Sequence, residues 1–315
     1  MKFYGQKTPM EDTTPRCGDV IRFCNCEYRL DGPELGRLRA ADDVLGDAEA
    51  LRRRLAEEGY LLLRGFLDRQ QVLAARRTIL AYMATHEGLE PGTRPLEGVM
   101  GSRGRGVPLM GRPAITHHPD VRAVLESPRL FILFEMLFGE PAITFSYKWL
   151  RAVGNEEATG AHMDHVYMGR GSKRVMTCWV PFGDIAVQQG TLAVCRGSHA
   201  DPAFEKLRNT YGRMDVDRDK VDGWFTRRPR EITETFGGKW LTDDFQAGDI
   251  LTFGMHLMHA STTNMTDRWR LSCDVRFQPA SEPVDERWAG DRPRGHDAAR
   301  GPIRPIQQVR AEWGV

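Results

Sequence analysis

The sequence predicts a mainly β fold with flanking helices, in which antiparallel strands build a sandwich or barrel. Strand-like segments follow one another through the second half of the chain without alternating helices, which argues against a doubly wound parallel sheet. The length of 315 residues suits one such domain, so a single domain over residues 1–315 is expected. The predicted strands are 142–153, 161–167, 175–181, 191–196, 249–254 and 269–278.

Helices are expected ahead of these strands. Helix-forming residues and boundary signals place them at 47–58, from Asp68 to about residue 86, and as a helix pair within 119–138. Gly59 and Gly139 are the predicted C-terminal stops, because glycine readily takes the left-handed conformation that ends a helix. Residues 60–66 are predicted to form a strand, so the domain begins helix, strand, helix.

Four regions depart from this regular pattern. Residues 1–45 look irregular, and residues 89–119 are rich in Gly, Arg and Pro and are predicted to form a long surface loop. Residues 200–240 carry mixed charges and read as an insertion or lid over the open end of the barrel. Residues 281–315 are expected to lie on the surface as an extended tail.

Composition limits the class of partner. Hydrophobic residues make up 41% and charged residues 28% of a chain with a formal net charge of +1, so neither nucleic acid nor an anionic membrane is expected. No apolar run approaches the ~20 residues that span a bilayer, and the first residues lack the apolar core of a signal peptide. The expectation is a cytoplasmic protein with a small-molecule partner, and nothing indicates its oligomeric state.

The cysteines predict reduced thiols rather than disulfides. Three of the six lie in predicted strands, where a small buried thiol is usual, and a chain of this size has core enough without disulfides. The alternative is a metal site at Cys17, Cys24 and Cys26. These residues lack the paired Cys-x-x-Cys spacing of structural zinc modules.

The motif with the most chemical content is His162-Met163-Asp164, with His259 far downstream. Residues two apart in an extended segment point to the same side, so His162 and Asp164 can both face inward. The apolar run 249–259 is predicted to be the partner strand that brings His259 to them. Two histidines and one carboxylate form the facial triad of non-haem Fe(II) sites, which leaves positions open for oxygen activation.

A cationic anchor lies on the next predicted strand. Arg270 offers a rigid two-pronged donor that suits a carboxylate, and Ser261 could add a hydroxyl donor. Together they would hold the distal carboxylate of 2-oxoglutarate while its 2-oxo acid end chelates the iron. Arg268 and Arg276 would point to the same face of the strand as Arg270, so strand periodicity alone excludes neither of them as the anchor.

At these residues the sequence resembles the phytanoyl-CoA dioxygenase family of Fe(II)/2-oxoglutarate-dependent oxygenases. The resemblance covers a core of about 45–280 and rests on the ordered segments 58–66, 160–164, 179–184, 190–199, 248–249 and 259–261, with Arg270. It implies a double-stranded β-helix, the jelly-roll or cupin-like fold. Residues 1–45 and 200–240 depart most from the family, so the resemblance does not imply a substrate.

The resemblance also implies roles for individual residues. The implied iron ligands are His162, Asp164 and His259. The implied 2-oxoglutarate contacts are Arg270 and Ser261, with Trp179, Lys148 and Tyr147 lining the pocket. His256 competes as third ligand, but His259 has the family spacing to Arg270. His165 is expected to be structural or to lie behind the ligands.

Substrate contacts are predicted from position alone. Tyr167 and Arg170 directly follow the metal pair, so they are expected at the mouth of the site. Arg170, Lys173 and the loop residues Arg103 and Arg105 could accept an anionic molecule.

The leading functional hypothesis is a dioxygenase that hydroxylates a small molecule with Fe(II), 2-oxoglutarate and O2, releasing succinate and CO2. Because Asp164 fills the carboxylate position, no site is left for halide, and hydroxylation is favoured over halogenation. One alternative is a Zn(II)-dependent hydrolase on the same three residues, in which Arg270 has no role. The other is a non-catalytic metal-binding cupin-like protein, against which the complete set of ligands and anchor argues.

Overall fold

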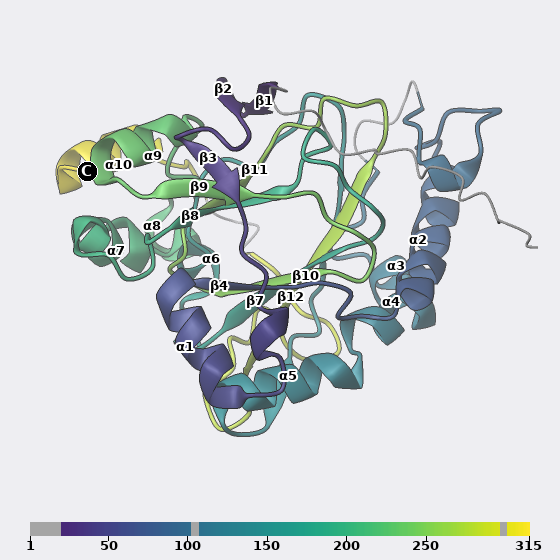
Figure 1. The fold of residues 1–315 in the computed structure, drawn as a ribbon, viewed down its shortest axis with the longest axis horizontal. Helices are drawn as coiled ribbons and strands as arrows, with labels where there is room; N and C mark the ends of the chain where they lie inside the picture. Colours follow the sequence, from purple (N-terminus) through teal and green to yellow (C-terminus); the bar gives the residue numbers. More distant parts are fainter. Residues whose placement is uncertain (1–19, 102–106, 297–300) are drawn as a thin grey trace, which may run out of the picture.

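The computed structural model describes residues 20–101, 107–296 and 301–315 and shows two central sheets with helices on their flanks (Figure 1). A separate hairpin of β1 (Val20–Phe23) and β2 (Cys26–Arg29) lies at one end of the molecule. The mainly β fold predicted from the sequence is therefore confirmed. Cys17, Arg103 and Arg105 lie outside the described residues.

The two central sheets differ in size. The six strands of the larger sheet are, in spatial order, β4 (Tyr60–Leu63), β10 (Ile250–Gly254), β7 (Met176–Pro181), β12 (Arg270–Pro279) and β5 (Ala142–Thr144), with β6 (Trp149–Val153) also paired to β12. The four strands of the smaller sheet are β11 (His259–Ser261), β8 (Leu192–Arg196), β9 (Lys239–Thr242) and β3 (Leu35–Arg37). Among these described strands, only β3 and β9 pair in parallel. Residues 142–153, predicted as one strand, form two.

Strand β12 separates the core of the protein from its candidate site. Its residues alternate between apolar and polar, and neighbours in a strand point to opposite faces. The apolar residues join the core that packs against the helices: Leu271, Cys273, Val275 and Phe277. The polar residues face the space between the two sheets: Arg270, Ser272, Asp274 and Arg276.

Among the described residues, three of the four apolar clusters form layers that hold this arrangement together. The first lies between the larger sheet and the N-terminal helices. The second lies between the sheets, where Trp179 and Phe253 of the larger sheet meet Val194 of the smaller one. The third packs Trp240 and the outer face of the smaller sheet against the helical segments that follow β8. The interior between the sheets is therefore apolar at one end and polar where the candidate site lies.

The helices against the larger sheet follow the predicted boundaries closely. They are α1 (Ala48–Glu58), α2 (Arg69–Ala84), α4 (Pro119–Leu125) and α5 (Pro128–Phe138), whereas the short α3 (Pro113–Thr116) was not predicted and lies in the segment expected to be a loop. Asp47 and Asp68 accept hydrogen bonds from the first-turn N–H groups of α1 and α2. Gly59 and Gly139 end α1 and α5 in the left-handed conformation, as predicted. No helix among the described residues is long and apolar enough to cross a membrane.

The predicted surface loop at 89–119 is only partly exposed. Leu109 and Ile115 are buried in the core beside α2, and Leu89 forms a bridge with Met100. The Gly, Arg and Pro content of this segment predicts irregular backbone but not the apolar anchors within it.

The insertion at 200–240 is a packed helical layer. It contains α7 (Glu205–Asn209), α8 (Val216–Asp219) and α9 (Pro229–Phe236), and it buries Phe204, Tyr211 and Phe225 completely. These side chains form the third apolar layer with the smaller sheet. The segment therefore packs around buried aromatic side chains of its own, which a loosely attached lid would lack.

The C-terminal segment is not the extended surface tail that was expected. Trp288 is completely buried, and α10 (Ile306–Trp313) packs Ile306 and Val309 against the third apolar layer. The high Arg, Pro and Gly content of 281–315 suggested an extended chain, although the segment also contains the buried Trp288 and the short amphipathic helix α10.

The segment that carries His162 and Asp164 is not the predicted strand 161–167. Ala161 and His162 form only isolated bridges, and His162 pairs with His259. Asp164 has helical dihedral angles (φ −62°, ψ −25°), and the short helix α6 (His165–Met168) follows it. The two ligand candidates therefore converge through a turn into a helix rather than through strand alternation.

The apolar run 249–259 is likewise not one strand. It leaves the larger sheet at Gly254, turns through 255–258, and enters the smaller sheet as β11 at His259. This change of sheet carries His259 to the bridge with His162. Hydrophobicity alone does not reveal it, because the turn residues Met255, Leu257 and Met258 are themselves buried.

Candidate metal centre

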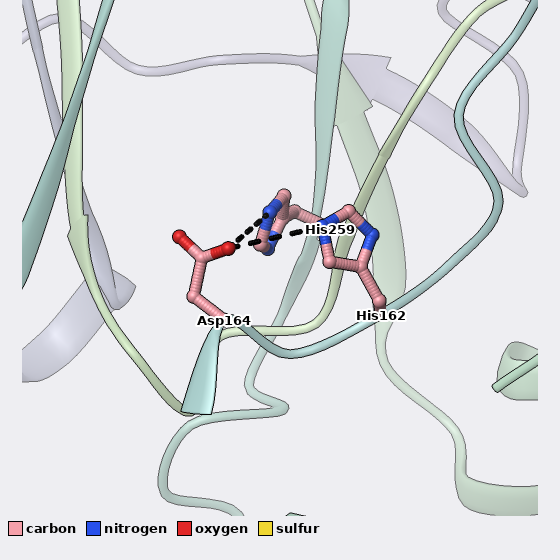
Figure 2. A group of neighbouring side chains, drawn as sticks. All are labelled: His162, Asp164 and His259. Atoms are coloured by element: carbon pink, nitrogen blue, oxygen red, sulfur yellow. Dashed lines mark ion pairs between the residues drawn. The ribbon is translucent and has the colours of Figure 1, made fainter. Parts of the chain in front are cut away.

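His162, Asp164 and His259 converge at the edge between the two sheets. One ligand atom from each lies within 4.8 Å of the others, and all three residues are buried. Asp164 Oδ1 lies 3.8 Å from His162 Nε2 and 3.7 Å from His259 Nε2. Figure 2 shows this single carboxylate oxygen directed at both imidazole rings. The sequence motif therefore yields one compact group of three donors.

Backbone carbonyl groups orient both imidazole rings. His162 Nδ1 lies 2.8 Å from the carbonyl oxygen of Gly160, and His259 Nδ1 lies 2.9 Å from that of Leu257. A carbonyl oxygen only accepts, so Nδ1 carries the proton in each ring and Nε2 keeps its lone pair. Burial, followed by the neighbouring charge of His259, lowers the pKa of His162 to about 3. His162 is thus a neutral ligand, and in both rings Nε2 is the nitrogen that faces Asp164.

The carboxylate of Asp164 is held through its other oxygen. Thr177 Oγ1 donates a hydrogen bond to Oδ2, and Arg276 Nη2 lies 3.0 Å from the same atom. Burial opposes ionisation, but Arg276 and the two histidines outweigh it, so the pKa of Asp164 lies well below its usual range. The carboxylate therefore stays ionised, and its Oδ1 stays directed at the imidazoles.

This donor set fits a non-haem Fe(II) ion. Two neutral imidazoles and one carboxylate make the facial triad, and hydrogen-bonded neighbours fix the orientation of each donor. Within the described residues, no other group of His, Cys, Asp and Glu could hold a metal ion. Cys24 and Cys26 are free thiols, and Cys17, the third residue of the alternative metal site, lies outside the described residues.

The competing histidine, His256, lies elsewhere. Its ring stacks on that of His165, with the ring centroids 4.7 Å apart. His165 begins α6 directly after Asp164, so its side chain leaves the metal group on the other side of that helix. The structure therefore brings His259 to the pair His162 and Asp164, and it does not bring His256 there.

Arg270 is buried and forms no ion pair with a carboxylate of the described residues. Its Nη1 donates to Ser272 Oγ and its guanidinium lies over the Trp179 ring, 6.0 Å from the centroid, while its Nε atom has no partner among the described residues. Burial, followed by the neighbouring charge of Arg151, lowers the pKa of Arg270 to about 10. A buried guanidinium with an unused donor fits the distal carboxylate of 2-oxoglutarate.

The other two candidate anchors have different surroundings. Arg268 is half exposed, and its closest carboxylate oxygens, on Glu97 and Asp267, lie 3.9 and 3.8 Å away. Arg276 is engaged with Asp164 and stacks over Trp149, 4.5 Å from the ring centroid. Of the three arginines, Arg270 is thus the buried one that has no ion pair with a carboxylate where the structure describes the chain.

The remaining cosubstrate candidates divide between the interior and the outer core. Ser261 is buried two residues after His259, and its Oγ accepts the N–H of Thr159 (2.8 Å), so its own proton remains available. Trp179 is buried beneath Arg270. Lys148 points away from the site, because its ammonium group pairs with Glu126 (3.2 Å) and donates to the Phe145 carbonyl. This geometry does not support the expectation that Lys148 lines the cosubstrate pocket.

A cavity of about 180 Å³ opens onto His162 and Asp164. Tyr167, predicted at the mouth of the site, and Tyr147, predicted to line the cosubstrate pocket, both line it, and the Tyr167 ring meets His162 edge to face with the centroids 5.5 Å apart. Arg170 does not line it, because its guanidinium forms a two-pronged pair with Asp215 outside the cavity. The structure therefore places Arg170 at another pocket, and this geometry does not support its predicted place at the mouth.

Sequence reasoning missed several residues of this cavity. Its further walls include Met110, Trp149, Arg151, Trp224 and His296. The pairing of Ser272 with Arg151 and of Asp274 with Trp149 puts β6 residues beside the polar face of β12. The strand alternation that pointed to Arg270 and Arg276 could have identified Trp149 and Arg151, had β6 been known as the partner strand of β12.

Two comparisons of sequence relate the chain to known enzymes. A sequence model of the phytanoyl-CoA dioxygenase family matches residues 55–272. The chain is also 29% identical over 251 residues to a 1-deoxypentalenic acid 11-beta-hydroxylase from Streptomyces exfoliatus, an alignment that covers 76% of this chain and 83% of the hydroxylase. The enzyme of the same name from Streptomyces arenae is 29% identical over 252 residues, with the same coverage.

Solved structures agree on the fold. The epimerase SnoN in complex with Fe3+, alpha ketoglutarate and nogalamycin RO is 23% identical and superposes with a TM-score of 0.53, over 75% of this chain and 85% of SnoN. EctD from S. alaskensis in its apoform is 15% identical with a TM-score of 0.54, over 87% and 92% of the two chains. These likenesses confirm the predicted double-stranded β-helix. With the family match extending over most of its length, the chain belongs to the phytanoyl-CoA dioxygenase family.

Proposed function

We propose that the protein is an Fe(II)- and 2-oxoglutarate-dependent dioxygenase that hydroxylates a small molecule. One observation carries the proposal: three oriented metal donors share the interior between the sheets with a buried arginine that pairs with no carboxylate in the described ranges. Thr177 and Trp179 connect them, because both lie on the same face of β7, Thr177 bonded to Asp164 and Trp179 beneath Arg270.

The residues of the chain have distinct roles in this proposal. His162, Asp164 and His259 hold the iron, and Arg270 with Ser261 holds the distal carboxylate of 2-oxoglutarate. When bound, iron and 2-oxoglutarate supply the oxidising power from O2 and yield succinate and CO2. The protein orients the target carbon and excludes water, which the aromatic walls of the cavity favour.

The substrate is a small molecule with an apolar body and an anionic group. Aromatic and thioether side chains form much of the cavity wall, among them Met110, Tyr147 and Trp224. Arg151 also lines it, with its Nε bonded to Asp274 (2.8 Å) and its side chain partly exposed to the cavity. The relatives from Streptomyces are named for an acid, which supports an anionic substrate for this chain as well.

Succinate release tests the proposal. The protein is loaded anaerobically with Fe(II), supplied with 2-oxoglutarate and a panel of apolar carboxylic acids, and exposed to O2. Succinate should form with iron and not with Zn(II), and a matching acid should increase its formation. Hydrolysis of a substrate by the Zn(II)-loaded protein, at the same rate with and without 2-oxoglutarate, would instead indicate the hydrolase, in which Arg270 has no role.

A further inference from the structure

A second pocket lies on the side of α6 away from the candidate metal centre. It has a volume of about 650 Å³, and five basic side chains line it: Arg170, Lys173, Arg208, Arg213 and Arg218. Asp215 is the carboxylate among its lining residues. We propose that this basic pocket binds a small anion that carries phosphate groups, at a site separate from the oxidation chemistry.

Two of the five cations are neutralised locally. Arg170 forms a two-pronged pair with Asp215, and Arg218 forms one with Asp219, with both contacts at 2.7 Å. Asp215 is fully engaged, because it also accepts the N–H groups of Asp217 and Arg218 at the start of α8. It cannot neutralise a further cation in the pocket.

The other three cations have no carboxylate partner within the described part of the chain. The Arg208 guanidinium donates to the backbone carbonyls of Ser198, Ala200 and Asp201, and Lys173 Nζ donates to that of Gly169. Carbonyl groups satisfy these donors but leave the positive charge in place. The Arg213 guanidinium has no hydrogen-bond or ion-pair partner among the described residues. Three uncompensated charges around one pocket match a multiply charged anion better than a single carboxylate.

Two imidazoles add hydrogen-bonding groups to the same pocket. His165 and His256 both line it, with their rings stacked at 4.7 Å. His165 Nδ1 is buried and has no partner among the described residues. A buried polar atom without a partner is costly, and a bound anion or its water would satisfy it.

The basic pocket is distinct from the cavity over the metal donors, because the two share no lining residue. They occupy opposite sides of α6, with Tyr167 and Met168 facing the cavity and His165 and Gly169 facing the basic pocket. The proposal therefore goes beyond the dioxygenase function and does not depend on iron.

Calorimetric titration of the full chain with inorganic pyrophosphate tests the proposal. The wild-type protein, metal-free to prevent chelation, should bind pyrophosphate with an affinity that falls as salt is added. Arg213→Glu should weaken binding about tenfold, since it reverses a charge in the pocket. Arg77→Glu is the matched control, because Arg77 is exposed on α2 outside the pocket, and it should change affinity less than about twofold.

Two further arms separate the alternatives. His162→Ala should bind pyrophosphate as the wild type does, which distinguishes failure of the metal proposal from failure of this one. Succinate should bind about tenfold more weakly than pyrophosphate, because it carries less charge. Absence of wild-type binding, equal weakening by Arg77→Glu, loss in His162→Ala, or equal affinity for succinate would each overturn the proposal.

Discussion

Arg276 Nη2 lies 3.0 Å from Asp164 Oδ2, and both side chains are buried. The contact leaves Asp164 Oδ1 as the oxygen that faces His162 and His259. Partners behind a metal ligand fix its orientation and charge. Arg276 is therefore a positioning residue for the proposed iron ligand Asp164.

Arg276→Lys should weaken iron binding about 10- to 100-fold, because an ammonium group keeps the charge but loses the planar geometry that holds Oδ2. Competition titration against a metal indicator measures this change. Arg268→Lys provides the control, since Arg268 is half exposed and pairs only at 3.8–3.9 Å. Equal iron affinity in the Arg276 variant and the control would mean that Arg276 does not position Asp164.

Arg270→Met should abolish stabilisation by 2-oxoglutarate without reducing the free energy of unfolding of the ligand-free protein. The buried guanidinium has no carboxylate partner among residues 20–101, 107–296 and 301–315, so an apolar side chain of similar length avoids its desolvation cost. Urea unfolding with and without 2-oxoglutarate measures both effects. A loss of several kcal/mol in the ligand-free variant would identify Arg270 as a structural residue instead.

Metal-free protein should lose stability as the pH falls from about 6.5 toward 3. Burial lowers the pKa of His162 to about 3. Between these pH values His162 is therefore protonated in the unfolded chain and neutral in the folded protein, which favours unfolding. One such group changes the free energy of unfolding by up to about 1.4 kcal/mol per pH unit. His162→Gln should show a shallower slope in urea unfolding at several pH values, and an unchanged slope would contradict the burial argument.

Trp288→Ala should reduce the free energy of unfolding by about 3–5 kcal/mol. Trp288 is completely buried, and its ring meets Tyr147, Trp149 and His296 within 5.3 Å. Urea unfolding measures the loss. Ile303→Ala in the same C-terminal segment is 51% exposed and should change stability by less than about 0.5 kcal/mol. A Trp288 variant as stable as the Ile303 variant would restore the surface-tail interpretation.

The sequence predicted the elements with strong local signals. Asp47 and Gly59 bound α1 because a side-chain cap and a left-handed glycine act within a few residues. The alternation along β12 likewise predicted which side of that strand carries Arg270. These features depend on neighbours in the chain, so the chain alone reveals them.

Features that depend on distant partners were predicted less well. The turn that places Asp164 at the start of α6 is fixed by contacts such as the hydrogen bond from His165 N–H to the Met255 carbonyl (3.1 Å). The direction of Lys148 depends on Glu126, and that of Arg170 on Asp215. None of these partners is identifiable from spacing or composition, so the metal donors were predicted and the cavity walls were not.

The central claim is that His162, Asp164 and His259 hold an Fe(II) ion that 2-oxoglutarate chelates. The most direct test is the visible absorption of the Fe(II) 2-oxo acid chelate, measured anaerobically as 2-oxoglutarate is added to iron-loaded protein. The band should appear in the wild type and in His256→Ala, whose side chain stacks on His165 away from the donors. It should be lost in His162→Ala, Asp164→Ala and His259→Ala. A band that persists in His259→Ala and disappears in His256→Ala would contradict the assignment.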